Sequence, residues 1–195
     1  MAVVSSSRRR SGRMTRREQL VAAGARLFAD RGFHGVTIEE LGTAVGISGP
    51  GVYKHFASKD AVLAEMLVGI SDHLLSQGRR EVAQATTSDV ALDRLLAFHT
   101  DFALNCADLI RVQDRDLANL SAGEARRVRS LQRSYVELWV EVLTRRDHSL
   151  TEQEARTKAH AVFGLLNSTP HSAAARDAEG AGATLQRMAH AALDA

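Results

Sequence analysis

The apolar residues of this chain recur every three or four positions and do not alternate with polar residues over any long stretch. This spacing is typical of amphipathic helices and gives almost no indication of strands. Only two prolines, Pro50 and Pro170, interrupt the sequence. We therefore predict an all-α protein. Longer helices are expected over residues 15–31, 59–77, 89–105, 107–120, 122–146, 151–168 and 179–194. Two short helices are expected between the first and the second of these.

The two short helices have clear start and turn signals. Thr37 and Glu40 have the spacing of a capping box, in which each side chain satisfies a backbone N–H of the other residue. Gly46 can supply a turn with positive φ, and Ser48 can cap the second helix. Gly42 lies where the second helix must approach the first closely. The pattern is that of a helix-turn-helix.

The polar residues of the second short helix and its ends are expected to face outward, as in a recognition helix that enters the major groove. They are Ser48, Gly49, Gly51, Tyr53, Lys54 and His55. Lys59 gives a second indication, because a cation in the first turn of a helix opposes the helix dipole. A DNA phosphate at this helix N-terminus would reverse that effect. The alternative is an exposed lysine in an unfavourable position.

Charge is distributed unevenly along the chain. The net charge is +2, but residues 1–60 carry ten Lys and Arg against five Asp and Glu, whereas residues 61–195 carry 15 against 18. The part with the helix-turn-helix pattern is therefore the basic one. Such asymmetry indicates nucleic-acid binding, although charge alone does not separate DNA from RNA or an acidic membrane.

Residues 1–13 are rich in serine and arginine and lack apolar periodicity, so we expect a disordered basic arm. Such an arm can follow the minor groove of DNA. The alternative is a solvated extension, with the true start at Met14. No apolar stretch follows the arginines as in a secretory signal, and no 18-residue apolar run occurs. We therefore expect a cytoplasmic protein that does not bind membranes.

Four segments together resemble the TetR-type (TetR/AcrR) one-component transcriptional regulators: residues 27–33, 36–41, 49–56 and 57–63. The resemblance implies an all-α homodimer with a three-helix DNA-binding domain over residues 14–58. It also implies that a long fourth helix links this domain to a larger ligand-binding and dimerisation domain over residues 59–195. The expected partners are double-stranded operator DNA, a small-molecule inducer and a second copy of the chain.

The resemblance also implies roles for single residues. Phosphate contacts fall on Thr37, Tyr53, His55 and Lys59, and positions at or near base edges fall on Ser48, Gly49, Gly51 and Lys54. Family members often have a long side chain and a threonine where this chain has Gly49 and Gly51. Because glycine has no side chain to bond a base, we expect sequence reading to depend on Lys54, Thr43, the basic arm and DNA shape.

The inward stripes of the later helices are where a ligand cavity is expected. Polar residues that would orient a ligand there are His99, Asn105, Arg111, Asn167 and His171. The expected walls are Phe102, Cys106, Tyr135, Trp139 and Phe163. The alternative for most of them is ordinary core packing, and for Arg111 an exposed, ion-paired turn of helix.

The sequence gives little support for catalysis. Cys106 is the only cysteine, and it follows His99 by two helical turns. A Cys–His nucleophile is one hypothesis, but no orienting Asn or Asp is evident, which favours a buried cysteine and a core histidine. No histidine spacing indicates a metal site, and no glycine-rich phosphate loop occurs. We expect no enzyme, no metal and no cofactor.

The last two predicted helices are rich in small apolar residues, and residues 161–166 are apolar nearly all round, which favours a partner helix from a second copy. The leading hypothesis is a repressor released from a pseudo-palindromic operator by a hydrophobic or acyl-type inducer. Two rivals remain: an enzyme that uses His99 and Cys106, and a nonspecific DNA-coating protein, which Gly49 and Gly51 favour. The patterns do not distinguish activation from repression.

Overall fold

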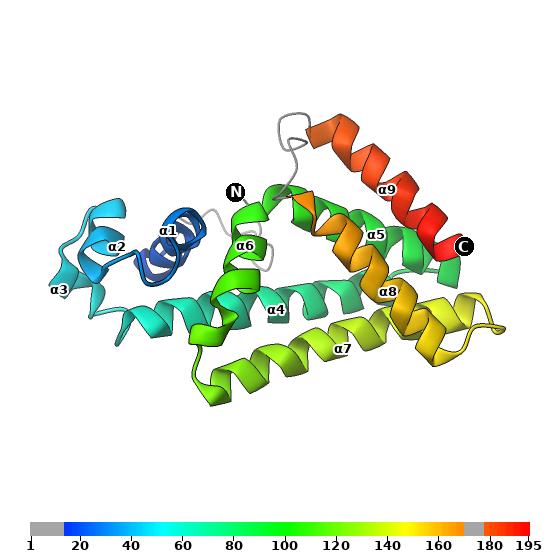
Figure 1. Ribbon diagram of the computed structural model, residues 1–195, viewed down its shortest axis with the longest axis horizontal. Coiled ribbons are helices and arrows are strands. Elements are labelled where there is room, and N and C mark those ends of the chain that lie inside the picture. Colours follow the sequence, from blue (N-terminus) through cyan, green and yellow to red (C-terminus); the bar gives the residue numbers. More distant parts are fainter. Residues whose placement is uncertain (1–13, 170–177) are drawn as a thin grey trace. The chain divides into compact units, whose positions relative to one another are not determined.

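A computed structural model describes residues 14–169 and 178–195, and all regular structure in these ranges is helical (Figure 1). The elements are α1 (Arg16–Arg31), α2 (Ile38–Ala44), α3 (Gly49–Val52), α4 (Lys59–Ala83), α5 (Ser88–Asn105), α6 (Ala107–Asp116), the 3₁₀ turn η1 (Leu117–Asn119), α7 (Ala122–Arg146), α8 (Glu152–Leu166) and α9 (Ala178–Asp194). The all-α prediction is confirmed. The basic arm and His171 lie outside the described residues.

The chain divides into two compact units. Unit 1 comprises the residues up to Ser71 together with Asp108–Arg129, and unit 2 comprises Asp72–Ala107 and Ser130–Ala195. The predicted DNA-binding segment, residues 14–58, therefore lies in a larger unit that also holds α6. The helices α4 and α7 contribute residues to both units.

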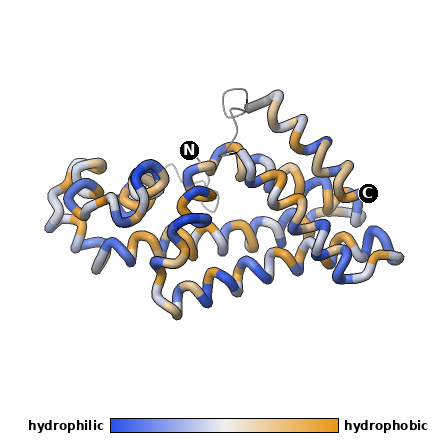
Figure 2. Tube along the Cα trace, in the orientation of Figure 1, coloured by the Kyte–Doolittle hydropathy of each residue, from blue (hydrophilic) through white to orange (hydrophobic). Residues whose placement is uncertain are grey.

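The core of unit 1 joins the three N-terminal helices to the start of α4 and to α6. Leu20, Phe28, Leu41, Val52 and Leu63 are fully buried in it. Apolar residues recur along each helix at the spacing that the sequence predicted (Figure 2). The expected capping box at α2 is confirmed, since the Glu40 N–H donates to the Thr37 hydroxyl at 3.2 Å and the Thr37 N–H donates to the Glu40 carboxylate at 2.8 Å.

The core of unit 2 lies among α5, α7, α8 and α9. Trp139, Leu95, Leu143, Leu166 and Leu193 are fully buried there. Among the described residues, no helix is both long enough and apolar enough to span a membrane.

Two helix ends differ from the prediction. The helix α4 continues past residue 77 to Ala83. Gly78 in this extension packs against the Tyr135 ring, where a β-carbon would lie only 2.7 Å from Cε2. The helix predicted over residues 107–120 ends at Asp116 and continues as a 3₁₀ turn. The reason is tertiary: the Asp116 carboxylate is buried, accepts the Phe33 N–H at 3.4 Å and binds Arg115.

Candidate DNA-binding surface and buried aromatic cluster

The turn between α2 and α3 is built on two glycines. Gly46 has φ +73°, a conformation that only glycine adopts without strain. Gly42 allows the chain to return, since the Ile47 N–H donates to the Gly42 carbonyl at 2.9 Å. A β-carbon on Gly42 would lie 2.7 Å from the Ile47 oxygen and 3.0 Å from the Ser48 oxygen. The close approach predicted at Gly42 is confirmed.

The helix α3 is short. Ser48 caps it by accepting the Gly51 N–H at 3.3 Å, and Val52, its last residue, is fully buried. Lys54 and His55, which were expected on this helix or its ends, lie in the turn that follows its last residue. Two glycines among four residues weaken the helix, and the buried Phe56 draws the chain back to the core.

The predicted contacts differ in exposure. Tyr53 is 56% exposed, although large aromatic side chains are usually covered, and Ser48 and Lys54 are exposed beside it. Thr43 is also exposed, but its hydroxyl donates back to the Glu39 carbonyl at 2.8 Å. Gly49 is buried against Glu39, so the expectation that it is exposed is wrong, and its place near a base edge stays a prediction. The exposed surface at the turn is therefore centred on Tyr53 and Lys54.

Lys59 has protein partners that the sequence did not indicate. Its ammonium donates to the carbonyls of Phe33 and Val36, both at 2.7 Å, and lies 4.3 Å from the centre of the Phe33 ring. These carbonyls compensate the cation at the start of α4, so no phosphate is needed to explain its position. Two of the three N–H donors of the Lys59 ammonium thus bind carbonyls of the loop between α1 and α2, and the third is available to another acceptor.

The end of α1 is held by α6 within unit 1. The Arg115 guanidinium donates to the Phe28 carbonyl, which also accepts the Gly32 N–H at 2.8 Å, and donates at 3.3 Å to the Ala29 carbonyl. Asp116 pairs with Arg115 at 3.1 Å and accepts the Phe33 N–H. We call these two residues the α6 clasp.

Unit 2 contains a buried aromatic cluster, which we define as His99, Tyr135, Trp139 and Phe163. Every pair of these four rings has its centroids within 6.3 Å, and the Tyr135 and Phe163 rings stack at 5.6 Å. The helices α5, α7 and α8 each contribute to it. Because Phe163 is only half-buried, the cluster reaches the surface on the α8 side.

Hydrogen bonds fix the protonation of His99. One imidazole nitrogen, Nε2, lies 3.2 Å from the Asn167 Oδ1, and Nδ1 lies 3.2 Å from the Tyr135 hydroxyl. Since a carbonyl oxygen only accepts, Nε2 carries the proton and Nδ1 accepts from the hydroxyl. Burial lowers the pKa of His99 from 6.5 to about 4 and raises the pKa of Tyr135. The pair is therefore uncharged at neutral pH.

A buried donor of the cluster, the Trp139 Nε1, has no hydrogen-bond partner among the described residues. The Trp139 N–H lowers the Tyr135 pKa against the larger effect of burial, but it makes no hydrogen bond with a described residue. An unpaired buried donor costs about 1–3 kcal/mol. Such a donor marks a place where an added acceptor would be stabilised.

Both parts of the chain match models of one family. The model of bacterial regulatory proteins of the tetR family matches residues 20–66, and a model of the tetracyclin repressor-like C-terminal domain matches residues 85–171. The chain belongs to the TetR family. The family explains the combination of a helix-turn-helix in unit 1 with a separate helical unit 2.

Individual relatives agree with this membership. The chain is 31% identical over 134 residues to the HTH-type transcriptional repressor KstR2 of Rhodococcus jostii, a match that covers 68% of this chain and 66% of that protein. A TetR-family regulator from Bordetella parapertussis has the same fold, with a TM-score of 0.81, 22% identity and 91% and 94% coverage. AibR, solved with isovaleryl coenzyme A and operator DNA, has a TM-score of 0.75, 15% identity and 89% and 97% coverage.

The predicted ligand residues of this TetR-family protein are brought together only in part. The rings and Asn167 meet, and Phe102 lies against His99 with centroids 5.7 Å apart. Asn105 is exposed and binds Asp101, and Arg111 pairs with Asp108 at 3.5 Å in unit 1, so neither joins the cluster. Both find partners within one helical turn, which is the alternative that the sequence left open for Arg111.

The hypothesis of a nucleophile formed by Cys106 and His99 is not supported by the contacts of His99. Cys106 is buried at the end of α5, and both ring nitrogens of His99 are engaged by Tyr135 and Asn167, so His99 is not free to activate the thiol. No group of three metal-ligating side chains occurs within residues 14–169 and 178–195.

Stability should fall as the pH is lowered from 7 to 5. Below pH 6.5 the unfolded imidazole of His99 takes up a proton, whereas the folded one resists it down to about pH 4. This contribution is thus complete above pH 6.5 and is lost as the pH falls through that window. We expect a loss of about 2 kcal/mol at pH 5, measured by urea unfolding.

The His99→Gln variant is the control for this effect. Half-buried His73 also has a lowered pKa and acts in the same direction, but it is present in both proteins. The difference between the two pH profiles therefore isolates His99. Parallel profiles would contradict the assignment of a neutral, buried imidazole.

Proposed function

We propose that this protein is a ligand-responsive, sequence-specific DNA-binding transcriptional regulator that acts in the cytoplasm as a repressor. The observation that carries this proposal is the exposed pair Tyr53 and Lys54 at the end of a capped, glycine-turned helix-turn-helix in a TetR-family chain. Repression is proposed because the relative from Rhodococcus jostii is named a repressor.

The exposed groups at the helix-turn-helix suit a DNA duplex. Tyr53 and Ser48 offer hydroxyls for phosphates, and Lys54 offers the long cationic side chain that reaches a base edge or a phosphate. Because Gly49 and Gly51 have no side chains, few side chains of this helix can face the major groove. We infer that sequence reading depends on Lys54 and on DNA shape.

The proposed inducer site is the aromatic cluster. Its rings suit an apolar group, and the unpaired Trp139 N–H suits a carbonyl oxygen. An acyl thioester has both features, and the fold neighbour AibR was solved with isovaleryl coenzyme A. We therefore infer that the inducer is hydrophobic and of the acyl type, with His99 and Asn167 orienting it beside Phe163.

A signal from the cluster has a short route along the chain. His99 lies on α5, and Cys106 alone separates α5 from α6. At its other end α6 carries the clasp on α1, which positions the DNA-binding helices. We propose that the inducer binds one conformation of the chain more tightly than another, because only unequal affinity can shift such an equilibrium.

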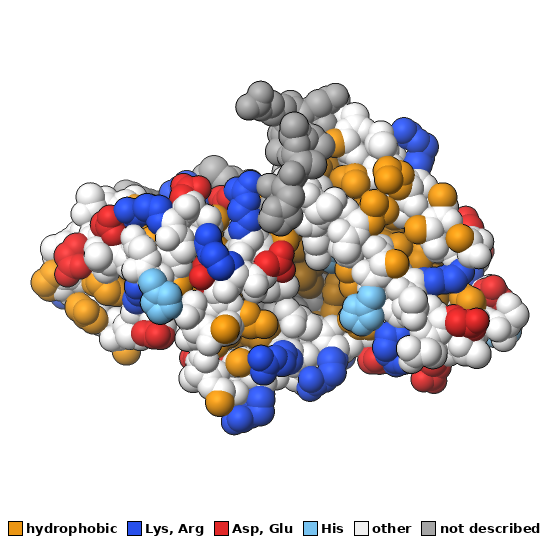
Figure 3. Space-filling view, in the orientation of Figure 1, with side chains coloured by type: hydrophobic (Ala, Val, Ile, Leu, Met, Phe, Trp, Pro, Cys, Tyr) orange, Lys and Arg blue, Asp and Glu red, His pale blue; other side chains and the backbone are white. Residues whose placement is uncertain are grey.

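We propose dimerisation through α8 and α9. Hydrophobic side chains gather on the surface over these helices (Figure 3). Met188 is 50% exposed, and Leu165 and Leu185 are half-buried. A twofold dimer would present two helix-turn-helix units, which predicts a pseudo-palindromic operator with half-sites about one DNA turn apart.

Selection of bound sites from random double-stranded DNA tests the proposal. We expect an inverted repeat bound about 10³-fold or more tightly than unrelated DNA, and release on addition of isovaleryl coenzyme A or a longer acyl thioester. A specific-to-nonspecific ratio near one would instead support the DNA-coating alternative. A monomer that ignores all duplexes at low salt would refute the whole proposal.

The salt dependence of the same binding separates the roles of two lysines. Lys54→Gln should reduce the slope of log affinity against log salt by about 0.9 if Lys54 contacts a phosphate, and should change the selected sequence if it contacts a base. Lys59→Gln should weaken binding with little change in slope, because its ammonium holds the Phe33 and Val36 carbonyls. If Lys59→Gln instead reduces the slope of log affinity against log salt by about one, Lys59 contacts a phosphate.

A further inference from the structure

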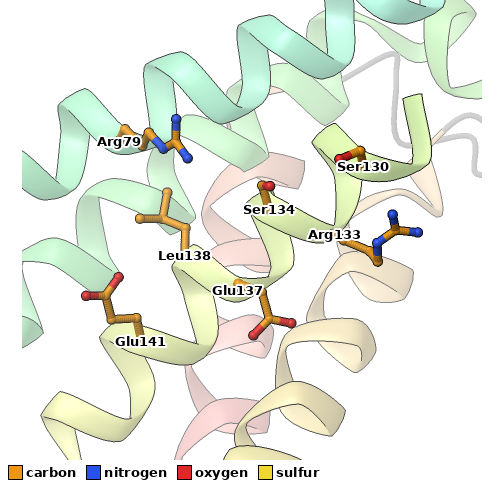
Figure 4. A pocket seen from close by; sticks show the side chains of 7 residues that line it. All are labelled: Arg79, Ser130, Arg133, Ser134, Glu137, Leu138 and Glu141. Atoms are coloured by element: carbon orange, nitrogen blue, oxygen red, sulfur yellow. The ribbon is translucent and has the colours of Figure 1, made fainter. Parts of the chain in front are cut away.

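Unit 2 has a surface depression that the proposed function does not use. It lies between α4 and α7, has a volume of about 410 Å³, and is lined by Arg79 from α4 and by residues of α7 that include Arg133, Ser130 and Ser134 (Figure 4). We call it the α4–α7 groove. Its volume is within the range of small-molecule sites, about 300–1,000 Å³.

The charges of the groove do not cancel. Its two carboxylates are already paired with arginines that do not line it: Glu137 with Arg156 at 2.7 Å, and Glu141 with Arg145. Its own arginines have no ion pair or hydrogen bond with any side chain or backbone group in the described chain. The groove therefore has two guanidinium groups in excess of its available carboxylates.

The hydroxyls of the groove are also available. Ser130 and Ser134 lie one turn apart on α7, and neither side chain bonds another group within residues 14–169 and 178–195. Figure 4 shows the Arg79 side chain reaching from α4 toward α7, where Ser134 and Leu138 lie. Guanidinium and hydroxyl donors placed around one space are typical of phosphate recognition.

The frame of the groove is rigid. At Gly78, next to Arg79, α4 and α7 touch so closely that a β-carbon would lie 2.7 Å from the Tyr135 ring and 3.1 Å from Leu138. Leu138 also lines the groove and gives it an apolar patch. The donors are thus carried by two helices in close contact, so only the donor side chains need to be ordered when a ligand binds.

We propose that the α4–α7 groove binds a phosphate-bearing small molecule, with the phosphate held by Arg79, Arg133 and the two serine hydroxyls. Leu138 would contact an apolar part of the same molecule. The two paired glutamates disfavour a long polyphosphate, so one phosphate group is the expected anchor. None of the residues that line the groove belongs to the aromatic cluster at which the inducer site is proposed.

Calorimetric titration of the full chain with inorganic phosphate, AMP, adenosine and coenzyme A tests the proposal at low ionic strength. We expect saturable binding of AMP that adenosine does not reproduce. Equal affinity for inorganic phosphate would identify free phosphate as sufficient. Tighter binding of AMP or coenzyme A would identify a nucleotide as the source of the phosphate. No saturable binding of any phosphate-bearing probe would overturn the proposal.

A double variant, Arg79→Gln with Arg133→Gln, should weaken this binding at least tenfold. Arg126→Gln with Arg127→Gln is the matched control, because both are exposed arginines of α7 that do not line the groove and the pair removes the same charge. Both variants remove exposed side chains, so their thermal midpoints should match the parent. An equal loss in the control would mean general attraction of anions to a basic surface, and the site would be rejected.

Discussion

Replacing Gly42 by alanine should lower operator affinity about 10- to 100-fold, which corresponds to about 1–3 kcal/mol of strain in a closely packed contact. The added β-carbon would meet the Ile47 carbonyl oxygen at 2.7 Å and the Ser48 oxygen at 3.0 Å. These are backbone atoms and cannot rotate away as a side chain would. The turn must shift, and α3 and Tyr53 shift with it. Titration of the selected operator measures the loss.

The same substitution at Gly69 is the matched control. Gly69 lies inside α4, and a β-carbon there would meet nothing within 4 Å. Gly69→Ala should therefore leave operator affinity unchanged and stabilise the protein by about 0.5–1 kcal/mol through helix propensity. Full operator affinity in Gly42→Ala would mean that the spacing of α2 and α3 is unimportant for binding.

The features predicted correctly from the sequence are those with local causes. The Thr37–Glu40 capping box, the positive φ of Gly46 and the Ser48 cap each depend on residues within a few positions. Gly42 was predictable for a related reason, since the turn begins only a few residues after it. Local hydrogen bonding and steric limits decide these features before tertiary packing acts.

The features that the sequence did not show depend on distant partners. Lys59 binds carbonyls 23 and 26 residues earlier in the chain, and the expectation of a phosphate contact arose because those acceptors were unknown. Gly49 is buried by Glu39, a contact across the turn. Periodicity shows which face of a helix is apolar but not which group lies opposite a polar side chain.

The aromatic cluster is an intermediate case. The stripes that contain His99, Tyr135 and Trp139 were predicted to face inward, and they do. Their meeting with Phe163 and Asn167 required the packing of three helices, which no single stripe encodes. Asn105 has the same residue type as Asn167 but lies on an exposed face, so residue type alone did not separate them.

Replacing Trp139 by alanine should destabilise unit 2 by about 3–5 kcal/mol, the usual cost of removing a large, fully buried side chain. Its ring contacts His99, Tyr135 and Phe163, so the cavity would open in the centre of the aromatic cluster. Urea unfolding followed by circular dichroism measures the loss. Trp139→Phe should retain most of the packing and also remove the unpaired Nε1, so its loss should be clearly smaller.

Tyr53→Ala separates stability from DNA binding in the same experiments. Because the Tyr53 side chain is exposed, its removal should change stability by less than about 0.5 kcal/mol while weakening operator binding. Trp139→Phe should show the converse: intact operator binding, but a weaker response to an acyl thioester that needs the indole N–H. An unaltered inducer response in Trp139→Phe would contradict the inducer site at the aromatic cluster while leaving the DNA-binding proposal intact, because the two depend on different units of the chain.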